Sequence, residues 1–226
     1  MTTPAPFRLR PPEAGDTAGA YQVCLKTGNF GQDGEPFYRE DPEALGRVFV
    51  GPYLAFEPEL ARILEDDQGI CGYVLAAMDS RDFYARYEAD WRPGLCEAYP
   101  APTGDSAGWN RVQQIHRVYH HPDYFCPEPY AQYPSHLHID LLPRAQGLGL
   151  GRLMMTEVLN LLHQRGSPGA HLGVSLPNVP AQGFYRKLGF QPLIQVGEGM
   201  EGCLYLGYRL DVLTRSDQAP VPASRT

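Results

Sequence analysis

A glycine-rich turn between a predicted strand and a predicted helix constrains this chain more than any other feature of its sequence. The segment SHLHIDLL (135–142) is predicted to be a strand, and LGRLMMTEVLNLLHQRG (150–166) carries apolar residues at helical spacing and ends on a glycine. Between them, Gly147, Gly149 and Gly151 alternate with leucines. Glycines at this spacing predict a backbone that comes close to a ligand and turns free N–H groups toward it.

The predicted ligand of this turn is an anionic phosphate group. The first turn of a helix has unpaired N–H donors and a partial positive charge, so it stabilises an oxyanion even in an acidic protein. The chain has 26 acidic and 19 basic residues, a net charge of −7 and no block of Lys or Arg. Nucleic acid is therefore excluded as a partner, because a phosphate backbone would be repelled overall.

Two familiar nucleotide-binding loops do not fit this turn. A dinucleotide-binding loop has the spacing G-x-G-x-x-G and a carboxylate at the end of the next strand, whereas this chain has G-x-G-x-G and no carboxylate at 175–177. The phosphate-binding loop of ATPases ends in Gly-Lys-Ser/Thr, whereas Gly151 is followed by Arg152. The turn therefore belongs to another kind of site.

Two motifs resemble those of the GCN5-related N-acetyltransferase (GNAT) superfamily. The segment QGLGLG (146–151) is similar to its acetyl-CoA loop, Q/R-x-x-G-x-G/A. Thirty residues on, Asn178 followed by AQGFYRKLGF (181–190) resembles the superfamily segment N-x-x-A-x-x-x-Y-x-x-x-G-F. The matching positions are Asn178, Ala181, Tyr185, Gly189 and Phe190. The resemblance covers roughly residues 135–210 and implies the GNAT fold, an α/β fold with a central, mixed, mostly antiparallel twisted sheet of about seven strands flanked by helices.

A narrower resemblance involves two further segments. ILEDDQGICGYVLAAMD (63–79) and HIDLLP (138–143) are similar to the C-terminal acetyltransferase-like domain of O-GlcNAcase and its free-standing bacterial relatives. In the animal domain the glycine loop is degraded. This chain keeps the glycines, which favours acetyl-CoA binding here.

The resemblance implies that acetyl-CoA binds beside the strand at 135–142 as a cosubstrate. In the superfamily this strand splays from its neighbour, and its backbone N–H groups receive the thioester carbonyl and the pantetheine amides. The pyrophosphate lies on N–H groups of the glycine turn. The residues expected to contact acetyl-CoA are Asp140, Leu141, Leu142, Gln146, Gly147, Leu148, Gly149, Leu150, Gly151, Arg152, Asn178, Ala181, Phe184, Tyr185 and Lys187.

Three residues are candidates for proton transfer. Tyr185 matches the superfamily tyrosine near the CoA sulfur and can return a proton to a thiolate, although a core tyrosine fits the same position. Asp140 is the candidate base, since a carboxylate at the end of an apolar strand has its pKa raised; the alternative is a buried salt bridge. His138, on the same strand face as His136 and Asp140, is a second candidate base. No spacing indicates a metal site.

The chain is predicted to form one acetyltransferase domain over 1–215, followed by a disordered tail at 216–226. The segment 80–134 is rich in aromatic residues and proline and is interpreted as an insertion that packs over its own core and walls the acceptor site. Asp16 and Asp41 are expected to cap two early helices. Other expected elements are strands at 7–10, 61–65, 70–78, 170–176, 192–196 and 203–210, with helices near 82–89, 109–118 and 180–190.

Composition and resemblance together predict where the protein works and what it does. Five scattered cysteines, without a C-x-x-C pair, and the absence of a long apolar run indicate a reduced cytoplasmic protein without a membrane partner. The resemblance implies acetyl transfer from acetyl-CoA to a primary amine, and the acceptor is not specified. The alternative is a catalytically silent acetyl-CoA-binding sensor or interaction domain. A homodimer is common in the superfamily, and the final strand could pair across subunits.

Overall fold

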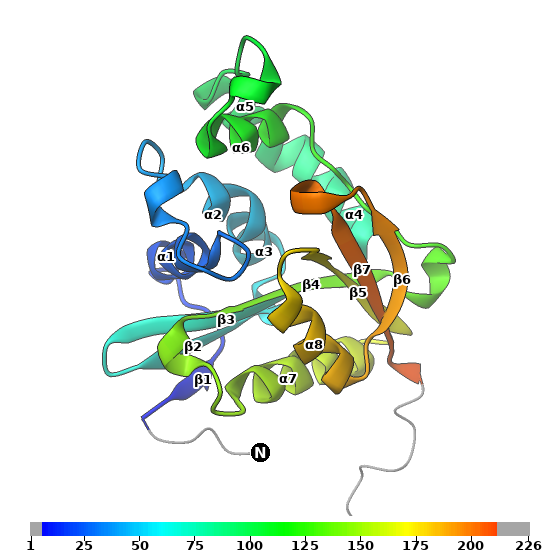
Figure 1. The fold of residues 1–226 in the computed structure, drawn as a ribbon. Helices are drawn as coiled ribbons and strands as arrows, with labels where there is room; N and C mark the ends of the chain where they lie inside the picture. Colours follow the sequence, from blue (N-terminus) through cyan, green and yellow to red (C-terminus); the bar gives the residue numbers. More distant parts are fainter. Residues whose placement is uncertain (1–5, 212–226) are drawn as a thin grey trace, which may run out of the picture.

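A seven-stranded sheet runs through the molecule, in a computed structural model that describes residues 6–211 (Figure 1). The strand order is β1-β2-β3-β4-β5-β7-β6, and every neighbouring pair is antiparallel except β4 and β5. The strands are β1 (Arg8–Arg10), β2 (Arg62–Asp66), β3 (Gly69–Ala77), β4 (Ser135–Leu141), β5 (Gly169–Ser175), β6 (Gln191–Val196) and β7 (Cys203–Arg209). The predicted mixed, mostly antiparallel sheet is confirmed. The predicted tail at 216–226 lies outside the described residues.

Two groups of helices cover the two faces of the sheet (Figure 1). The helices are α1 (Thr17–Thr27), α2 (Ala44–Phe49), α3 (Gly51–Phe56), α4 (Ser80–Arg86), α5 (Arg92–Ala98), α6 (Arg111–His120), α7 (Leu150–Gln164) and α8 (Val179–Leu188). Helices α7 and α8 lie on one face, and α1, α2 and α3 lie on the other. Each face has its own apolar core, so the sheet is buried on both sides over β3 and β4.

The α7 side holds the larger core because the apolar stripe of α7 is continuous. Its buried residues are Leu150, Met154, Met155, Val158, Leu159 and Leu162. They pack with apolar residues of β4 and β5 that point to the same face, among them Leu137, Leu172 and Val174. Gly166, with φ +90°, ends the helix as predicted.

The parallel pair β4 and β5 separates soon after it forms. Both strands have seven residues, but only Ser135 and His136 of β4 pair with β5, at Ala170 and His171. Beyond this point the strands diverge and leave one edge of β4 without a strand partner. This is the splayed strand that the sequence resemblance implied.

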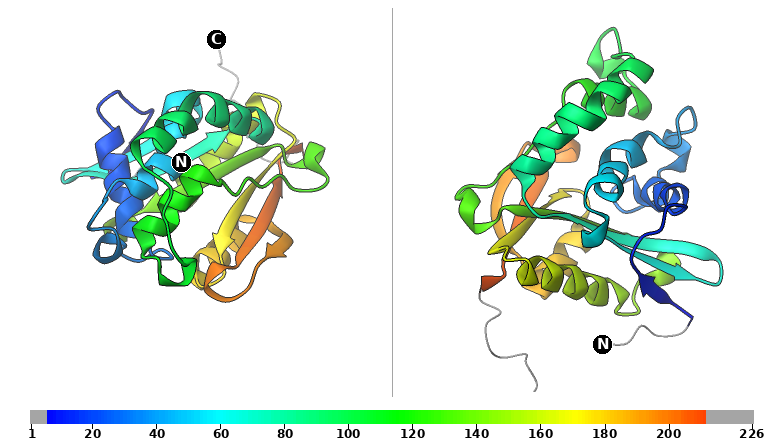
Figure 2. Two further views of the ribbon diagram at one scale, coloured as in Figure 1. Left: turned by 90° about the horizontal axis from the view of Figure 1, so that it is seen from above. Right: turned by 180° about the vertical axis from the view of Figure 1, so that it is seen from behind.

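The segment 80–134 is more helical than the sequence indicated. Residues Ser80–Ala98 form a continuous helical run in which the five-residue π-helix Tyr87–Trp91 joins α4 to α5. Figure 2 shows this run rising from the sheet, with α6 packed beside it. Tyr87, Leu95 and Tyr119 form a separate small core, which confirms that the segment packs over its own core.

Two predicted helix caps are wrong, because ion pairs take the carboxylates. Asp41 accepts bonds from Arg47 at 2.7 Å, and Glu43 precedes the first residue of α2. Asp16 precedes α1 but makes no side-chain cap; both its oxygens accept from Arg10, at 2.6 and 2.8 Å. The Asp16 carboxylate also accepts from the N–H of Glu13 at 2.6 Å, so its oxygens are turned to Arg10 and to the preceding chain and not to the first N–H groups of α1.

The Arg10 cluster predicts a stability effect. The Arg10 side chain is 11% exposed and also bonds Glu65 of β2, so it joins β1, β2 and the start of α1. Arg10→Met leaves Asp16 without its cation and Glu65 with Arg8 as its cation, and it is expected to cost about 3 kcal/mol at pH 7. The pKa of Asp16 is held below its usual value by this arginine, so the loss should shrink as the pH falls through the acid range. Urea unfolding at pH 7 and pH 3 measures both effects; an equal loss at both values would contradict the prediction.

The two edge strands of the sheet are β1 and β6, and the last strand of the chain, β7, is not an edge strand. β7 pairs with β5 on one side and with β6 on the other, so both of its edges are occupied. The expectation that this strand could pair across subunits is therefore wrong. Within residues 6–211, no helix is both long and apolar enough to cross a membrane.

Candidate active site

The glycine turn leaves the start of α7 open to solvent. Gly147 and Gly149 have φ of +74° and +79°, and a Cβ at either position would meet no atom within 4 Å. Gly149 precedes the helix without a side-chain cap, and residues 146–149 are exposed. The first N–H groups of α7 therefore face open space, which suits the pyrophosphate of acetyl-CoA.

The third glycine of the turn serves packing instead. A Cβ on Gly151 would lie 3.1 Å from Cζ of Phe184, so the absence of a side chain lets α7 and α8 approach closely. Leu150 is buried under the helix, whereas Leu148 is 53% exposed. Of the three glycines, two shape the open turn and one fits the neighbouring helix.

The free edge of β4 offers backbone groups next to this turn. Leu142 donates its N–H to the carbonyl of Cys71 on β3 at 2.8 Å. The expectation that this N–H binds acetyl-CoA is therefore wrong. Successive peptide groups of a strand point to opposite edges, so the N–H of Leu141 faces the opening while that of Asp140 faces β3. The Leu141 carbonyl accepts from the side chain of Gln146 at 2.8 Å.

Asp140 lies in this opening with partial solvent access. Its carboxylate accepts from the hydroxyl of Tyr73 at 2.5 Å, and no Lys or Arg of the described chain forms an ion pair with it. Burial raises the pKa of Asp140 to about 6, and the hydrogen bond from the Tyr73 hydroxyl partly opposes that rise. The predicted rise is therefore present, and the alternative of a buried salt bridge is wrong.

Tyr185 approaches the same carboxylate from α8. Its ring is buried in the α7 core between Phe184 and Phe190, and within residues 6–211 its hydroxyl has no hydrogen-bond partner. Burial, and secondarily the charge of Asp140, raise the pKa of Tyr185 above its usual value. Tyr185 is thus a core residue whose hydroxyl remains protonated near Asp140.

The other α8 residues named from the sequence have structural partners. The side chain of Asn178 caps the helix by accepting from the N–H of Ala181 at 3.2 Å. A Cβ on Gly31, in the turn between α1 and α2, would lie 3.1 Å from Nδ2 of Asn178, so that turn reaches the start of α8. Arg152 donates to the carbonyl of Lys187 at 3.3 Å, beside the exposed turn.

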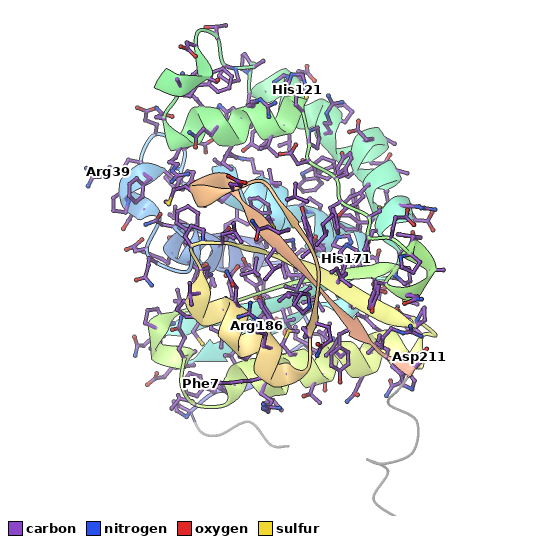
Figure 3. All side chains as sticks on the ribbon, turned by 45° about the vertical axis from the view of Figure 1, so that its right-hand side comes forward. Phe7, Arg39, His121, His171, Arg186 and Asp211 are labelled. Carbon is purple, nitrogen blue, oxygen red and sulfur yellow. The ribbon has the colours of Figure 1, made fainter. Side chains whose placement is uncertain are left out.

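Three histidines on the opposite face from α7 are held neutral. Burial lowers the pKa of His138 to about 4, and it also lowers the pKa values of His136 and His171. Nδ1 of His136 lies within hydrogen-bond distance of Oγ of Ser80, at 2.8 Å. Nε2 of His136 is buried and has no hydrogen-bond partner among the described residues. Figure 3 shows His171 near the centre of the sheet, with Arg186 on α8. His138 is therefore a poor acceptor of a proton near pH 7.

Aromatic residues of the 80–134 segment reach the same face. The ring of Phe125 stacks on Tyr205 of β7 with centroids 3.4 Å apart, and Tyr84 stacks on His136 at 5.2 Å. Gly173 in the middle of β5 pairs with Tyr205 and is exposed, although a central strand is normally covered. A Cβ there would lie 2.9 Å from the sulfur of Cys203.

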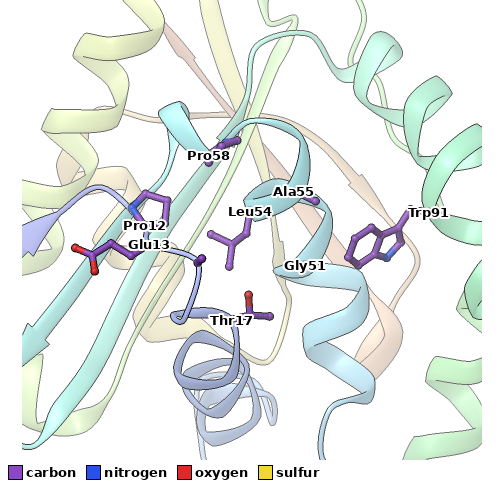
Figure 4. A pocket seen from close by; sticks show the side chains of 9 residues that line it. Pro12, Glu13, Thr17, Gly51, Leu54, Ala55, Pro58 and Trp91 are labelled. Atoms are coloured by element: carbon purple, nitrogen blue, oxygen red, sulfur yellow. The ribbon is translucent and has the colours of Figure 1, made fainter.

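A separate pocket of about 320 Å³ lies away from these residues (Figure 4). It is formed by the chain before α1, by α3 and by Trp91. Its lining contains none of the site residues that the sequence indicated. We therefore place the candidate site at the β4–β5 opening, where exposed backbone donors and titratable side chains meet.

A mixed sheet splayed beside an open, glycine-rich helix start defines an acetyltransferase fold. Comparison with known families agrees, since residues 32–190 match the acetyltransferase (GNAT) family. This match covers more than half of the chain, so the chain belongs to that family.

Two relatives show how far the similarity extends. The chain is 30% identical over 184 residues to Protein O-GlcNAcase of Rattus norvegicus and of Mus musculus, a match that covers 81% of this chain. It covers only 20% of each O-GlcNAcase, so the chain resembles one region of a much longer protein. It is also 37% identical to SsHAT, with a TM-score of 0.80, over 90% of this chain and 98% of that chain.

A more distant structure shares the fold alone. This is yncA from Salmonella typhimurium, solved with its cofactor acetyl-CoA. It is 13% identical, with a TM-score of 0.51, over 94% of this chain and 99% of that one.

Tyr73 is the site residue that the sequence did not indicate. It lies in the apolar run GYVLAA, where the sequence predicts an aromatic residue to be part of the hydrophobic core. Only the register of β3 against β4, which pairs Tyr73 with Asp140, shows that its hydroxyl reaches the carboxylate.

Proposed function

We propose that this protein is an acetyl-CoA-dependent N-acetyltransferase that transfers the acetyl group directly from the CoA thioester to a primary amine. One observation carries the proposal: a carboxylate with a raised pKa and a protonated tyrosine flank the free edge of β4, next to the open turn that begins α7. A binding site alone would need the turn and the free edge, but it would not need Asp140 poised near neutrality.

The backbone holds the cosubstrate in this proposal. N–H groups from Gly147 to Arg152 bind the pyrophosphate, because they combine free donors with the positive end of the α7 dipole. The N–H of Leu141 receives the thioester carbonyl and stabilises the negative charge that develops there. The amide of Asn178 and the ring of Phe184 line the pantetheine arm.

The side chains move two protons. The acceptor arrives as an ammonium, and Asp140 takes one proton from it. The free amine attacks the thioester carbon, a C–N bond forms and the C–S bond breaks, and the amine's second proton passes to the Tyr185 oxygen as that hydroxyl gives up its own proton. Asp140 returns the first proton to solvent after the product leaves. Tyr185 donates its proton to the departing CoA thiolate, since a hydroxyl with a pKa above 10 is protonated at neutral pH.

Asp140 is preferred to His138 as the base. With a pKa of about 6, Asp140 is mostly ionised at pH 7 and still basic enough to hold a proton, whereas His138, at about 4, holds one poorly. The exposed floor at Gly173 and the aromatic rings of the 80–134 segment form the acceptor side of the site. The acidic surface favours a cationic amine.

Tyr185→Phe tests catalysis separately from binding. We expect turnover to fall about 100-fold, the low end for loss of a general acid, with acetyl-CoA affinity within about twofold. The measurements are CoA thiol release over a panel of primary amines and calorimetric titration with acetyl-CoA. Tyr208→Phe is the control, because Tyr208 belongs to the same core and packs against Phe190 away from Asp140.

The same measurements separate the alternative. A catalytically silent acetyl-CoA-binding domain would bind the cosubstrate and release no CoA with any amine. Equal turnover of Tyr185→Phe and the parent protein would remove Tyr185 from the mechanism.

A further inference from the structure

A fully buried tyrosine stands directly behind Asp140. Tyr73 of β3 pairs with Asp140 of β4 in the sheet register, and its hydroxyl lies 2.5 Å from Oδ2 of the carboxylate. Burial raises the pKa of Tyr73 well above its usual value, so the proton stays on the tyrosine. Tyr73 is therefore the donor and Asp140 the acceptor.

Helix α1 closes this pair from behind. Cys24, which is buried, interacts with the Tyr73 hydroxyl, and Thr27 lies near the Asp140 carboxylate while its own hydroxyl donates to the Val23 carbonyl at 2.8 Å. The titratable groups that face Asp140 are thus Cys24 from α1, Tyr73 from β3 and Tyr185 from α8. Within the described residues no cation faces the carboxylate, so its only strong donor is Tyr73.

We propose that Tyr73 is a positioning residue for the acetyl transfer: its hydroxyl fixes one oxygen of Asp140 and leaves the other oxygen for the ammonium of the acceptor. The role of Asp140 as base rests on the function proposed above. The contact between the two side chains does not depend on it, so the contact can be tested without turnover.

The hydrogen bond has a second consequence for the base. A hydroxyl that donates to a carboxylate favours the ionised form, whereas burial disfavours it. Tyr73 therefore keeps Asp140 ionised at a pH where burial alone would leave it protonated. A tyrosine that served only to fill the core would have no such effect, because phenylalanine fills nearly the same volume.

Tyr73→Phe tests this role with two readouts. The first is the titration of the Asp140 carboxyl carbon, followed by ¹³C NMR and assigned by its loss in Asp140→Asn. We expect its midpoint to rise by roughly one pH unit, because the lost bond is charge-assisted. The second is the pH profile of kcat/KM, whose acid limb should move upward by the same amount, so that activity falls about fivefold at pH 6 and recovers above pH 8.

Tyr21→Phe is the matched control. Tyr21 is a buried tyrosine of the same core on α1, and it has no contact with Asp140. It should leave both the titration midpoint and the acid limb unchanged, and circular dichroism checks that both variants fold. An unchanged Asp140 midpoint in folded Tyr73→Phe would overturn the proposal.

The two readouts also keep this proposal apart from the proposed function. A shifted carboxyl midpoint in a protein that releases no CoA with any amine would support the Tyr73 contact and reject the transferase. A shifted midpoint with an unmoved acid limb would mean that Asp140 is not the base, so Tyr73 would not position it for acetyl transfer.

Discussion

Gly149→Ala is expected to weaken acetyl-CoA binding about 100-fold, because two charge-assisted bonds from the turn to the pyrophosphate depend on its left-handed backbone. Gly149 has φ +79°, a conformation that costs an alanine about 1 kcal/mol or more. An alanine would relax toward negative φ and rotate the first N–H groups of α7 away from the ligand. Calorimetric titration of the purified variant with acetyl-CoA measures the loss.

Gly166→Ala is a close control for this substitution. Gly166 lies just beyond the other end of α7 with φ +90°, and a Cβ there also meets no atom within 4 Å. Both variants should lose a similar amount of stability, but only Gly149→Ala should lose affinity. If the two variants bound acetyl-CoA equally well, the turn would not be the pyrophosphate site.

The glycine turn could be predicted from the sequence because local rules determine it, whereas the splayed strand was implied by the resemblance to the GNAT superfamily. Gly147 and Gly149 adopt positive φ, which other residues rarely do, and the apolar stripe of α7 fixes which side of the helix is buried. The alternation along SHLHIDLL placed His138 and Asp140 on one face of β4. The raised pKa of Asp140 followed from its place at the end of an apolar strand.

Contacts between distant segments could not be predicted in the same way. The sequence does not indicate that Arg10 would take the carboxylate of Asp16 from the start of α1, or that Tyr73 would face Asp140, 67 residues further on. The π-helical turn at Tyr87–Trp91 has no periodic signal, so the sequence predicts a helix only near 82–89 and not its continuation to residue 98. Each of these features depends on the register of strands or on packing between helices.

Asp140→Asn is expected to abolish turnover and to stabilise the protein at the same time. Loss of a general base costs a factor of about 100 or more in kcat. The pKa of Asp140 in the folded protein, about 6, lies above the 3.8 of a free carboxyl, so ionisation at neutral pH opposes folding. The asparagine has no such charge, and its carbonyl oxygen still accepts from Tyr73. The gain in unfolding free energy at pH 7 has an upper bound of about 3 kcal/mol.

The pH dependence of this gain identifies its cause. Below about pH 3 the carboxyl is protonated in both the folded and the unfolded chain, so the melting temperatures of Asp140→Asn and the parent should converge there. Asp16→Asn should act in the opposite direction and destabilise at pH 7, since Arg10 lowers the pKa of Asp16. At pH 7 the two substitutions should therefore change the unfolding free energy in opposite directions. This result would show that the charge of Asp16 stabilises the fold, whereas the charge of Asp140 destabilises it and serves the reaction. A lower melting temperature of Asp140→Asn at pH 7 would show that the folded protein favours the charge, and Asp140 would then be too acidic to serve as the base.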